Sequence, residues 1–307
     1  MEYVNPFVAL GLDLNIPEEG YSKAFLKQER KRILAEFELS GASVIELGGQ
    51  EVDRSTALKM LDMLQDAHAL DHHLFIAQRP SLLHFLEEAS LDFFYQGDIS
   101  LLHATSDEFL SFLGPHFAHS FNRRLNHAYR QKDWEEIKAM CGHPLPIPSG
   151  YQASCFKDTY REIHKQVAKV EEMTEGIKAG TPPDGRVQEV CDEMLMNVLN
   201  QLPEYFSASR DRYALALENL AIGIHNEHKR VQLALMILRQ ALKLHINEEA
   251  RTDIQNVLDQ LYKINPEASF FEMFSQEKQD KEGVNPWMVA LGVGAGIASL
   301  LLYRWLR

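Results

Sequence analysis

The sequence predicts an all-α protein, and three observations lead to that fold class. Apolar residues recur at helical spacing through much of the 307-residue chain. No run of alternating apolar and polar residues is long enough to predict a sheet. Short polar connections, such as Asn226-Glu227-His228, separate the clearest periodic stretches, which is typical of antiparallel helices that pack side by side. We therefore expect a protein of many packed helices.

Helices are expected along the first half of the chain. The first covers residues 21–39, where strong helix formers place the apolar side chains near one face. The second begins after Asp53 or Ser55, both favourable N-caps, and continues as one long helix over residues 55–76. Gly48-Gly49-Gln50 is predicted as a turn before it. Shorter helices are expected over a middle region of residues 77–141.

A proline-rich segment separates this middle region from the C-terminal part. Residues 142–150 carry three prolines at alternate positions between glycines, which excludes helix and favours an extended spacer. A bundle is expected over residues 151–264, beginning with a long charged helix over about residues 156–176. Its last helices are read from three periodic stretches, namely Tyr213 to Ile224, Val231 to Leu242, and Ile254 to Leu261.

The last helices of this bundle resemble one tetratricopeptide-type unit, in which paired helices stack to form peptide-binding grooves. No second copy occurs at the repeat period. A small helical bundle without repeats is therefore the alternative, and we favour it.

The C-terminal tail predicts a transmembrane helix. From Val284 to Tyr303 no charged residue occurs in 20 positions, and Trp287 and Trp305 stand near the two ends. A buried core helix is the alternative. Residues 265–283 would be a juxtamembrane linker. Because the N-terminus lacks the pattern of a signal peptide, we expect a single-pass, tail-anchored protein whose N-terminal bulk is cytoplasmic.

Small residues within the predicted span suggest helix packing in the membrane. Gly292 and Gly296 form a G-x-x-x-G pair, which lets two helix backbones approach closely. A homodimer through this helix is one interpretation, and the ordinary abundance of glycine and alanine in membrane spans is the other.

Composition and charge exclude several classes of protein. With 45% hydrophobic and 24% charged residues the chain is globular rather than disordered. The formal net charge of −13 opposes nucleic acid as a partner. The three cysteines lack any C-x-x-C spacing, which suits a reducing compartment and opposes a zinc ribbon.

No catalytic residue or cofactor is predicted. Nucleotide-binding and hydrolase loops of the familiar patterns are absent from the sequence. His68 and His72 are spaced to share a helix face, with Asp66 and Asp71 nearby, but no third metal ligand is identifiable. The same weakness applies to the second histidine group, which comprises His116, His119 and His127. No metal is therefore predicted.

The first 76 residues resemble a J-domain. Residues 5–12 carry an aromatic residue and a Leu-Gly pair, and residues 30–37 begin with a basic cluster on the first long helix. That family packs its basic second helix antiparallel against a third. It also carries His-Pro-Asp directly after the second helix, where this sequence has Glu38-Leu39-Ser40.

The resemblance implies a fold and a docking face rather than a chaperone-stimulating activity. The J-domain triplet that stimulates ATP hydrolysis by an Hsp70 is missing. A basic face of Lys27, Arg30, Lys31 and Arg32 could still dock a protein partner, and a solvated helix face is the alternative.

The sequence thus predicts a tail-anchored protein-interaction scaffold or chaperone-like adaptor at the cytosolic face of a membrane. Its expected partners are the lipid bilayer and a protein, with an Hsp70-type chaperone as one candidate. The alternatives are a metal-dependent enzyme that uses the histidine and acidic residues of residues 66–127, and an oligomeric membrane component.

Overall fold

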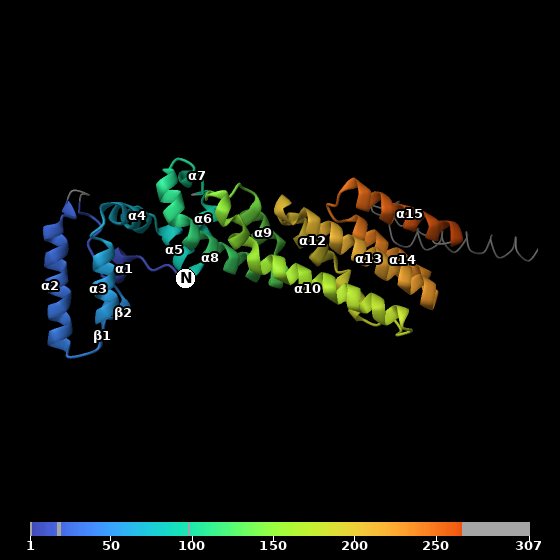
Figure 1. Cartoon of the computed structure of the whole chain (residues 1–307), viewed down its shortest axis with the longest axis horizontal. Helices are drawn as coiled ribbons and strands as arrows, with labels where there is room; N and C mark the ends of the chain where they lie inside the picture. The colour runs from blue at the N-terminus through green and yellow to red at the C-terminus, as the bar shows by residue number, and fades with distance from the viewer. Residues whose placement is uncertain (1, 17–19, 98, 266–307) are drawn as a thin grey trace, which may run out of the picture.

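The chain folds into an elongated, mostly helical molecule (Figure 1). This confirms the predicted all-α character. The computed structural model describes residues 2–16, 20–97 and 99–265. A small N-terminal module occupies one end, and the last helix, α15, lies toward the other (Figure 1).

In its described residues, the N-terminal module comprises four α-helices and one β-hairpin around its own core. In chain order these are α1 (Pro6–Ala9), α2 (Lys23–Ser40), β1 (Val44–Leu47), β2 (Gln50–Asp53), α3 (Arg54–Met63) and α4 (Ala67–Ala77). Side chains from each of these elements are buried together, among them Phe7, Ile33, Leu61 and Leu74. Helix α2 packs on α3, and α1 packs on α4.

The β-hairpin corrects the expectation that the chain contains no sheet. Strands β1 and β2 pair antiparallel, with Leu47 opposite Gln50 and Gly48-Gly49 as the two-residue turn. Both glycines have positive φ, 54° and 80°, which is the requirement of the tight hairpin turn that matches strand twist. The strands have four residues each, too few for an alternating pattern to stand out.

The helix expected over residues 55–76 is two helices. Helix α3 is capped by Asp53 as predicted, but it ends at Met63. Asp66 then accepts a hydrogen bond from the backbone N–H of Ala69 and caps a new helix, α4. Aspartate forms such caps because its side chain competes for backbone donors.

The rest of the described chain shares a second, larger core. Its short helices are α5 (Pro80–Glu88), α6 (Asp92–Tyr95), α7 (Ile99–Leu102), α9 (Trp134–Cys141), α11 (Arg186–Val190) and α12 (Glu193–Gln201). Its longer helices are α8 (Asp107–Gln131), α10 (Gln152–Lys178), α13 (Ser207–His228), α14 (Val231–Leu242) and α15 (Glu248–Ile264). Two 3-10 turns, η2 (Ser149–Tyr151) and η3 (Glu204–Phe206), precede α10 and α13.

Helix α10 is the spine of this larger part. It packs along α8 at one end and along α13 at the other, and α14 and α15 follow as a further layer. At 27 residues α10 is about 40 Å long. The proline-rich segment 142–150 joins α9 to α10, and its Ile147 is buried in the same core. The helices expected after residue 150 are present. Helices α10, α13 and α15 extend a few residues beyond the predicted stretches, and α14 has the predicted bounds.

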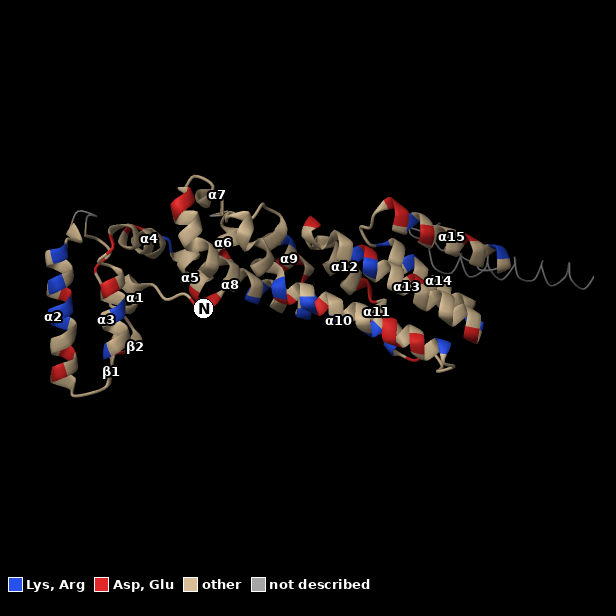
Figure 2. Cartoon of the chain, viewed as in Figure 1, with Lys and Arg blue, Asp and Glu red and all other residues tan. Residues whose placement is uncertain are grey.

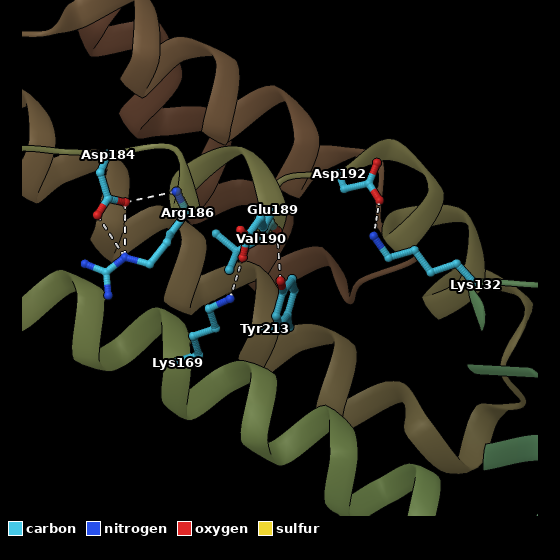
Figure 3. Close-up of polar contacts among 8 residues, drawn as sticks. All are labelled: Lys132, Lys169, Asp184, Arg186, Glu189, Val190, Asp192 and Tyr213. Atoms are coloured by element: carbon cyan, nitrogen blue, oxygen red, sulfur yellow. Dashed lines mark hydrogen bonds and ion pairs between the residues drawn. The ribbon is translucent and has the colours of Figure 1, made fainter. Parts of the chain in front are cut away.

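Helix α11 is fastened between its neighbours by polar contacts (Figure 3). The hydroxyl of buried Tyr213 donates to the carbonyl oxygen of Val190 at 2.8 Å. Lys169 on α10 pairs with Glu189 at 2.7 Å. These contacts hold the short helix against both α10 and α13.

Replacing Tyr213 with phenylalanine is expected to destabilise the protein by about 1–2 kcal/mol, because the carbonyl of Val190 loses its buried donor. Urea unfolding followed by circular dichroism measures the change. Tyr205→Phe is the matched control, since Tyr205 is 40% exposed and should change stability by less than about 0.5 kcal/mol. Equal effects of the two substitutions would contradict a stabilising role for the Tyr213 hydroxyl.

The predicted membrane span over residues 284–303 lies outside the described residues, as do Gly292 and Gly296 and most of the predicted linker. Among the helices that the structure describes, none is long and apolar enough to cross a bilayer.

Candidate protein-docking site on the N-terminal module

The predicted basic residues lie on helix α2, which forms the outer side of the N-terminal module. Ser22 caps its first turn by accepting from the N–H of Phe25, and Gly41 ends it in the left-handed conformation at φ 61°. Leu26, Ile33 and Phe37 are buried and face the module core. The position of α2 is therefore fixed by its apolar side, and the charged residues occupy the rest.

The charges on α2 run against the helix dipole. Cations outnumber the single acidic residue, Glu29, in the N-terminal half, and Glu36 and Glu38 follow Arg32 in the C-terminal half (Figure 2). The first turn contains no acidic residue and the last turn contains no basic one. Each misplaced charge near a helix end costs roughly 0.3–1 kcal/mol. The charges of the two end turns, such as Lys23 and Glu38, therefore do not stabilise the helix.

A groove runs between α2 and α3 beside these cations. It has a volume of about 240 Å³ and is lined by Lys23, Leu26, Lys27, Arg30, Leu61 and Gln65. Arg30 crosses it to pair with Asp62 of α3 at 2.5 Å, which ties the two helices together. The groove therefore combines an apolar floor with a basic rim.

Lys27 and Lys31 are exposed cations of α2, and Lys27 also lines the groove. They stand one helical turn apart, so their ammonium groups project from the same side of α2. Within the residues that the structure describes, neither lysine pairs with a carboxylate. Both are available to an acidic partner.

Arg32 does not share this side of the helix. Its guanidinium donates to Glu29 and Glu36, at 2.7 Å each, and reaches the carbonyl oxygen of Leu10 at 3.4 Å. It serves to join α2 to the end of α1. Lys23, by contrast, lines the groove. It was not among the residues predicted from the sequence, although it stands four residues before Lys27.

The residues at the position of the J-domain triplet form the end of α2. Glu38, Leu39 and Ser40 belong to its last turn, and Leu39 is 88% exposed. Only three residues separate Ser40 from strand β1. A folded hairpin thus follows α2 directly.

A buried polar network fastens the module to the rest of the protein. The side-chain amide of Asn5 donates to the hydroxyl of Tyr3 at 3.1 Å and to the carbonyl oxygen of His73 at 2.8 Å. The Tyr3 hydroxyl in turn lies 2.8 Å from Nδ1 of His73. The backbone N–H of Asn5 donates to Glu87 of α5 at 2.9 Å. The N-terminal segment therefore connects α4 of the module to α5.

The histidines considered as metal ligands are dispersed. The His68 side chain is 73% exposed and lies 3.5 Å from Glu108. His72 packs its ring against Phe109 and Phe112, and burial lowers its pKa.

The second histidine group is likewise spread along α8. The ring of His116 packs edge-to-face against the ring of Tyr3, with 4.9 Å between the ring centroids, whereas His127 is exposed. In the described part of the chain, no group of three or more His, Cys, Asp or Glu residues could hold a metal ion.

No protein-family model, curated protein or solved structure matches this chain.

Proposed function

We propose that the protein is a tail-anchored interaction scaffold whose degenerate J-like module docks an acidic surface of a protein partner. The observation that carries the proposal is the charge order of α2. Lys23 stands in the first turn, where the helix dipole disfavours a cation, and Lys27 and Lys31 remain without carboxylate partners among the described residues. Where a local rule is broken without a structural gain, a functional reason is expected.

The charge of the remaining chain supports this interpretation. The protein carries a formal net charge of −13, so a cluster of cations on one helix is a local exception. Such a patch steers an acidic partner toward the groove between α2 and α3 and disfavours other orientations. The floor of the same groove is formed by Leu26 and Leu61, which are nearly buried in the module core.

The arrangement of the molecule also suits a scaffold. The module has its own core and occupies the end of the elongated molecule opposite to α15, the last described helix before the predicted anchor (Figure 1). An anchor at residues 284–303 would attach the protein to a membrane by its other end. The module would then be displayed to partners.

An Hsp70-type chaperone is the partner that the J-domain resemblance suggests. We propose that the module binds such a chaperone without stimulating its ATPase, because Glu38-Leu39-Ser40 replaces the stimulating triplet. The role would be recruitment to the membrane rather than activation.

Reversing the charges of Lys27 and Lys31 is expected to weaken docking. In K27E/K31E the affinity of the full chain, held in phosphatidylcholine nanodiscs, for an Hsp70-type chaperone should fall at least about tenfold. Binding of the unmodified chain should weaken as salt is raised, and the ATPase rate should stay at its basal value. Surface-based binding measurements and a phosphate-release assay give these readouts.

The matched control is K157E/R161E, which places the same charge change one turn apart on exposed positions of α10. This variant should bind as the unmodified chain does. If both variants lose binding equally, the effect is one of net charge and the α2 site is excluded. If the unmodified chain does not bind, an Hsp70-type partner is excluded.

A further inference from the structure

A second exposed surface, of opposite charge, lies where α6 meets α9. Tyr95 ends α6 and is 62% exposed, and Trp134 begins α9 and is 36% exposed. The two helices pack against each other. Large aromatic side chains are rarely left in water without a reason when they stand together, because their burial is strongly favourable.

Tyr95 ends the short helix α6, which packs against α9. Partial burial, and after it the carboxylates of Glu136, Asp133 and Glu135, raise the pKa of the Tyr95 phenol. Asp133 and Glu135 are the two chain neighbours of Trp134. The two aromatic residues therefore belong to one surface with an acidic rim.

Two of the nearby cations are engaged, and a third, Lys138, stands three residues after Glu135 on α9. Arg124 pairs with the buried carboxylate of Glu136 at 2.5 Å. Lys132 pairs with Asp192 at the start of α12 (Figure 3). In the described parts of the chain, neither Asp133 nor Glu135 has a cationic partner. The rim therefore carries two exposed carboxylates without an ion-pair partner, and that of Asp133 also caps α9 by accepting from the N–H of Glu136.

The start of α12 adds a further apolar group to this neighbourhood. The pair between Lys132 and Asp192 places the first turn of α12 close to the first turn of α9. Met194, two residues after Asp192, is 48% exposed. Methionine is common at surfaces that accept helical peptides, because its flexible thioether adapts to different partners.

We propose that the aromatic acidic surface formed by Tyr95, Trp134, Asp133 and Glu135 binds a basic amphipathic helix of a partner protein. Tyrosine and tryptophan are the residue types that most often dominate binding energy at interfaces. The exposed carboxylates of Asp133 and Glu135 favour lysine and arginine on the polar side of the bound helix. This surface is distinct from the basic groove of α2, so the scaffold would dock two partners of opposite charge.

Trp134 itself reports binding in a chain without other tryptophans. The full chain carrying W287F/W305F, in phosphatidylcholine nanodiscs, is titrated with a synthetic helical peptide of leucine and lysine. We expect a saturable change in Trp134 emission. The leucine–glutamate counterpart of the peptide should cause none.

Two variants locate the site. D133N/E135Q should lower the affinity for the leucine–lysine peptide about tenfold, which corresponds to about 1.4 kcal/mol. Asparagine retains the N-cap at residue 133, so the helix itself is preserved. The control E248Q/E249Q removes two exposed charges from the first turn of α15 and should leave the affinity within about twofold. Tyr95→Ser should weaken binding without changing its salt dependence.

Three results would overturn the proposal. One is equal loss of affinity in D133N/E135Q and E248Q/E249Q, which would indicate attraction to the acidic protein as a whole. Another is unchanged affinity in both D133N/E135Q and Tyr95→Ser. The third is self-association of the peptide-free chain, measured as a concentration-dependent mass that D133N/E135Q abolishes, which would make a second copy the occupant.

Discussion

Replacing Gly48 with alanine is expected to unfold the N-terminal module, whereas the same replacement at Gly49 should be tolerated. A Cβ atom on Gly48 would lie 1.9 Å from the carbonyl oxygen of Val8 and 2.9 Å from the backbone nitrogen of Gly11. Both of these atoms belong to the backbone and cannot rotate away. The hairpin turn must therefore move off α1, and the core beneath it opens.

Gly49→Ala is the control that measures the cost of the backbone conformation alone, without the steric contact at residue 48. Gly49 also has positive φ, at 80°, but a Cβ there would meet no atom within 4 Å. Gly49→Ala should thus cost only the left-handed conformation, about 1 kcal/mol, whereas Gly48→Ala should cost more than about 3 kcal/mol.

Amide hydrogen exchange tests this prediction region by region. In Gly48→Ala we expect loss of protection in α2 and the hairpin, with α10 and α13 protected as before, because these helices belong to the larger core. Similar protection in the two alanine variants would contradict the close approach of the hairpin to α1.

The same glycines illustrate why the hairpin escaped prediction from sequence. Gly48-Gly49 was expected to form a turn, and it does, but the flanking strands have only four residues each. Their buried side chains, Leu47 and Val52, are apolar because the strands lie on the module core. Periodicity needs a longer stretch before a two-residue repeat differs from a helical one.

Helices were predictable where one apolar face persists for several turns. The stretches from Tyr213 and from Val231 are helical because such a face can be buried against one neighbour throughout its length. The break at Leu64–Asp66 was not foreseen, because apolar residues continue through it at helical spacing. The helix is nevertheless interrupted there, because the Asp66 side chain accepts from the backbone N–H of Ala69 and starts a new helix.

The docking sites depend on tertiary packing that a sequence does not display. The spacing of Lys27 and Lys31 was visible, but the Arg30–Asp62 pair and the diversion of Arg32 toward Leu10 depend on how α2 packs. The surface of Tyr95 and Trp134 joins residues almost forty positions apart. No local pattern in the chain brings them together.

Acidification is expected to loosen the attachment of the N-terminal module through His73. Because Asn5 donates to the Tyr3 oxygen, we assign the Tyr3 hydroxyl as donor to His73 Nδ1, which places the proton of the neutral ring on Nε2. If Nδ1 were protonated, its N–H and the Tyr3 O–H would both be donors, and the buried hydrogen bond between them would be lost. Burial, followed by repulsion from His116 and His72, lowers the pKa of His73 to about 4.

The direction of the pH effect follows from proton binding in the two states. An unfolded histidine titrates near 6.5, so between pH 6.5 and about 4 the unfolded chain binds more protons than the folded one. Stability therefore decreases as the pH falls through this window and is independent of His73 above it. Each unit of pKa difference is worth about 1.4 kcal/mol, so complete protonation of His73 is expected to remove about 3 kcal/mol.

Other groups at the junction modify this dependence without removing it. Burial lowers the pKa values of His72, His116 and His119 as well, which adds to the loss at low pH. Glu87 has a raised pKa, again mainly through burial, and its protonation in the folded state acts in the opposite direction. Glu2, Glu108 and Arg123 lie at the same junction but are exposed, so solvent screens their influence.

The His73→Gln variant isolates the contribution of this one residue. Glutamine does not titrate, so unfolding free energies measured in urea should depend less steeply on pH between 6.5 and 4 than those of the unmodified chain. The substitution can lower stability at every pH through lost packing, but the slope is unaffected by such a constant offset. His127→Gln, which removes an exposed histidine of α8, should leave the slope unchanged. Equal slopes in the unmodified chain and in His73→Gln would show that protonation of His73 does not govern the junction.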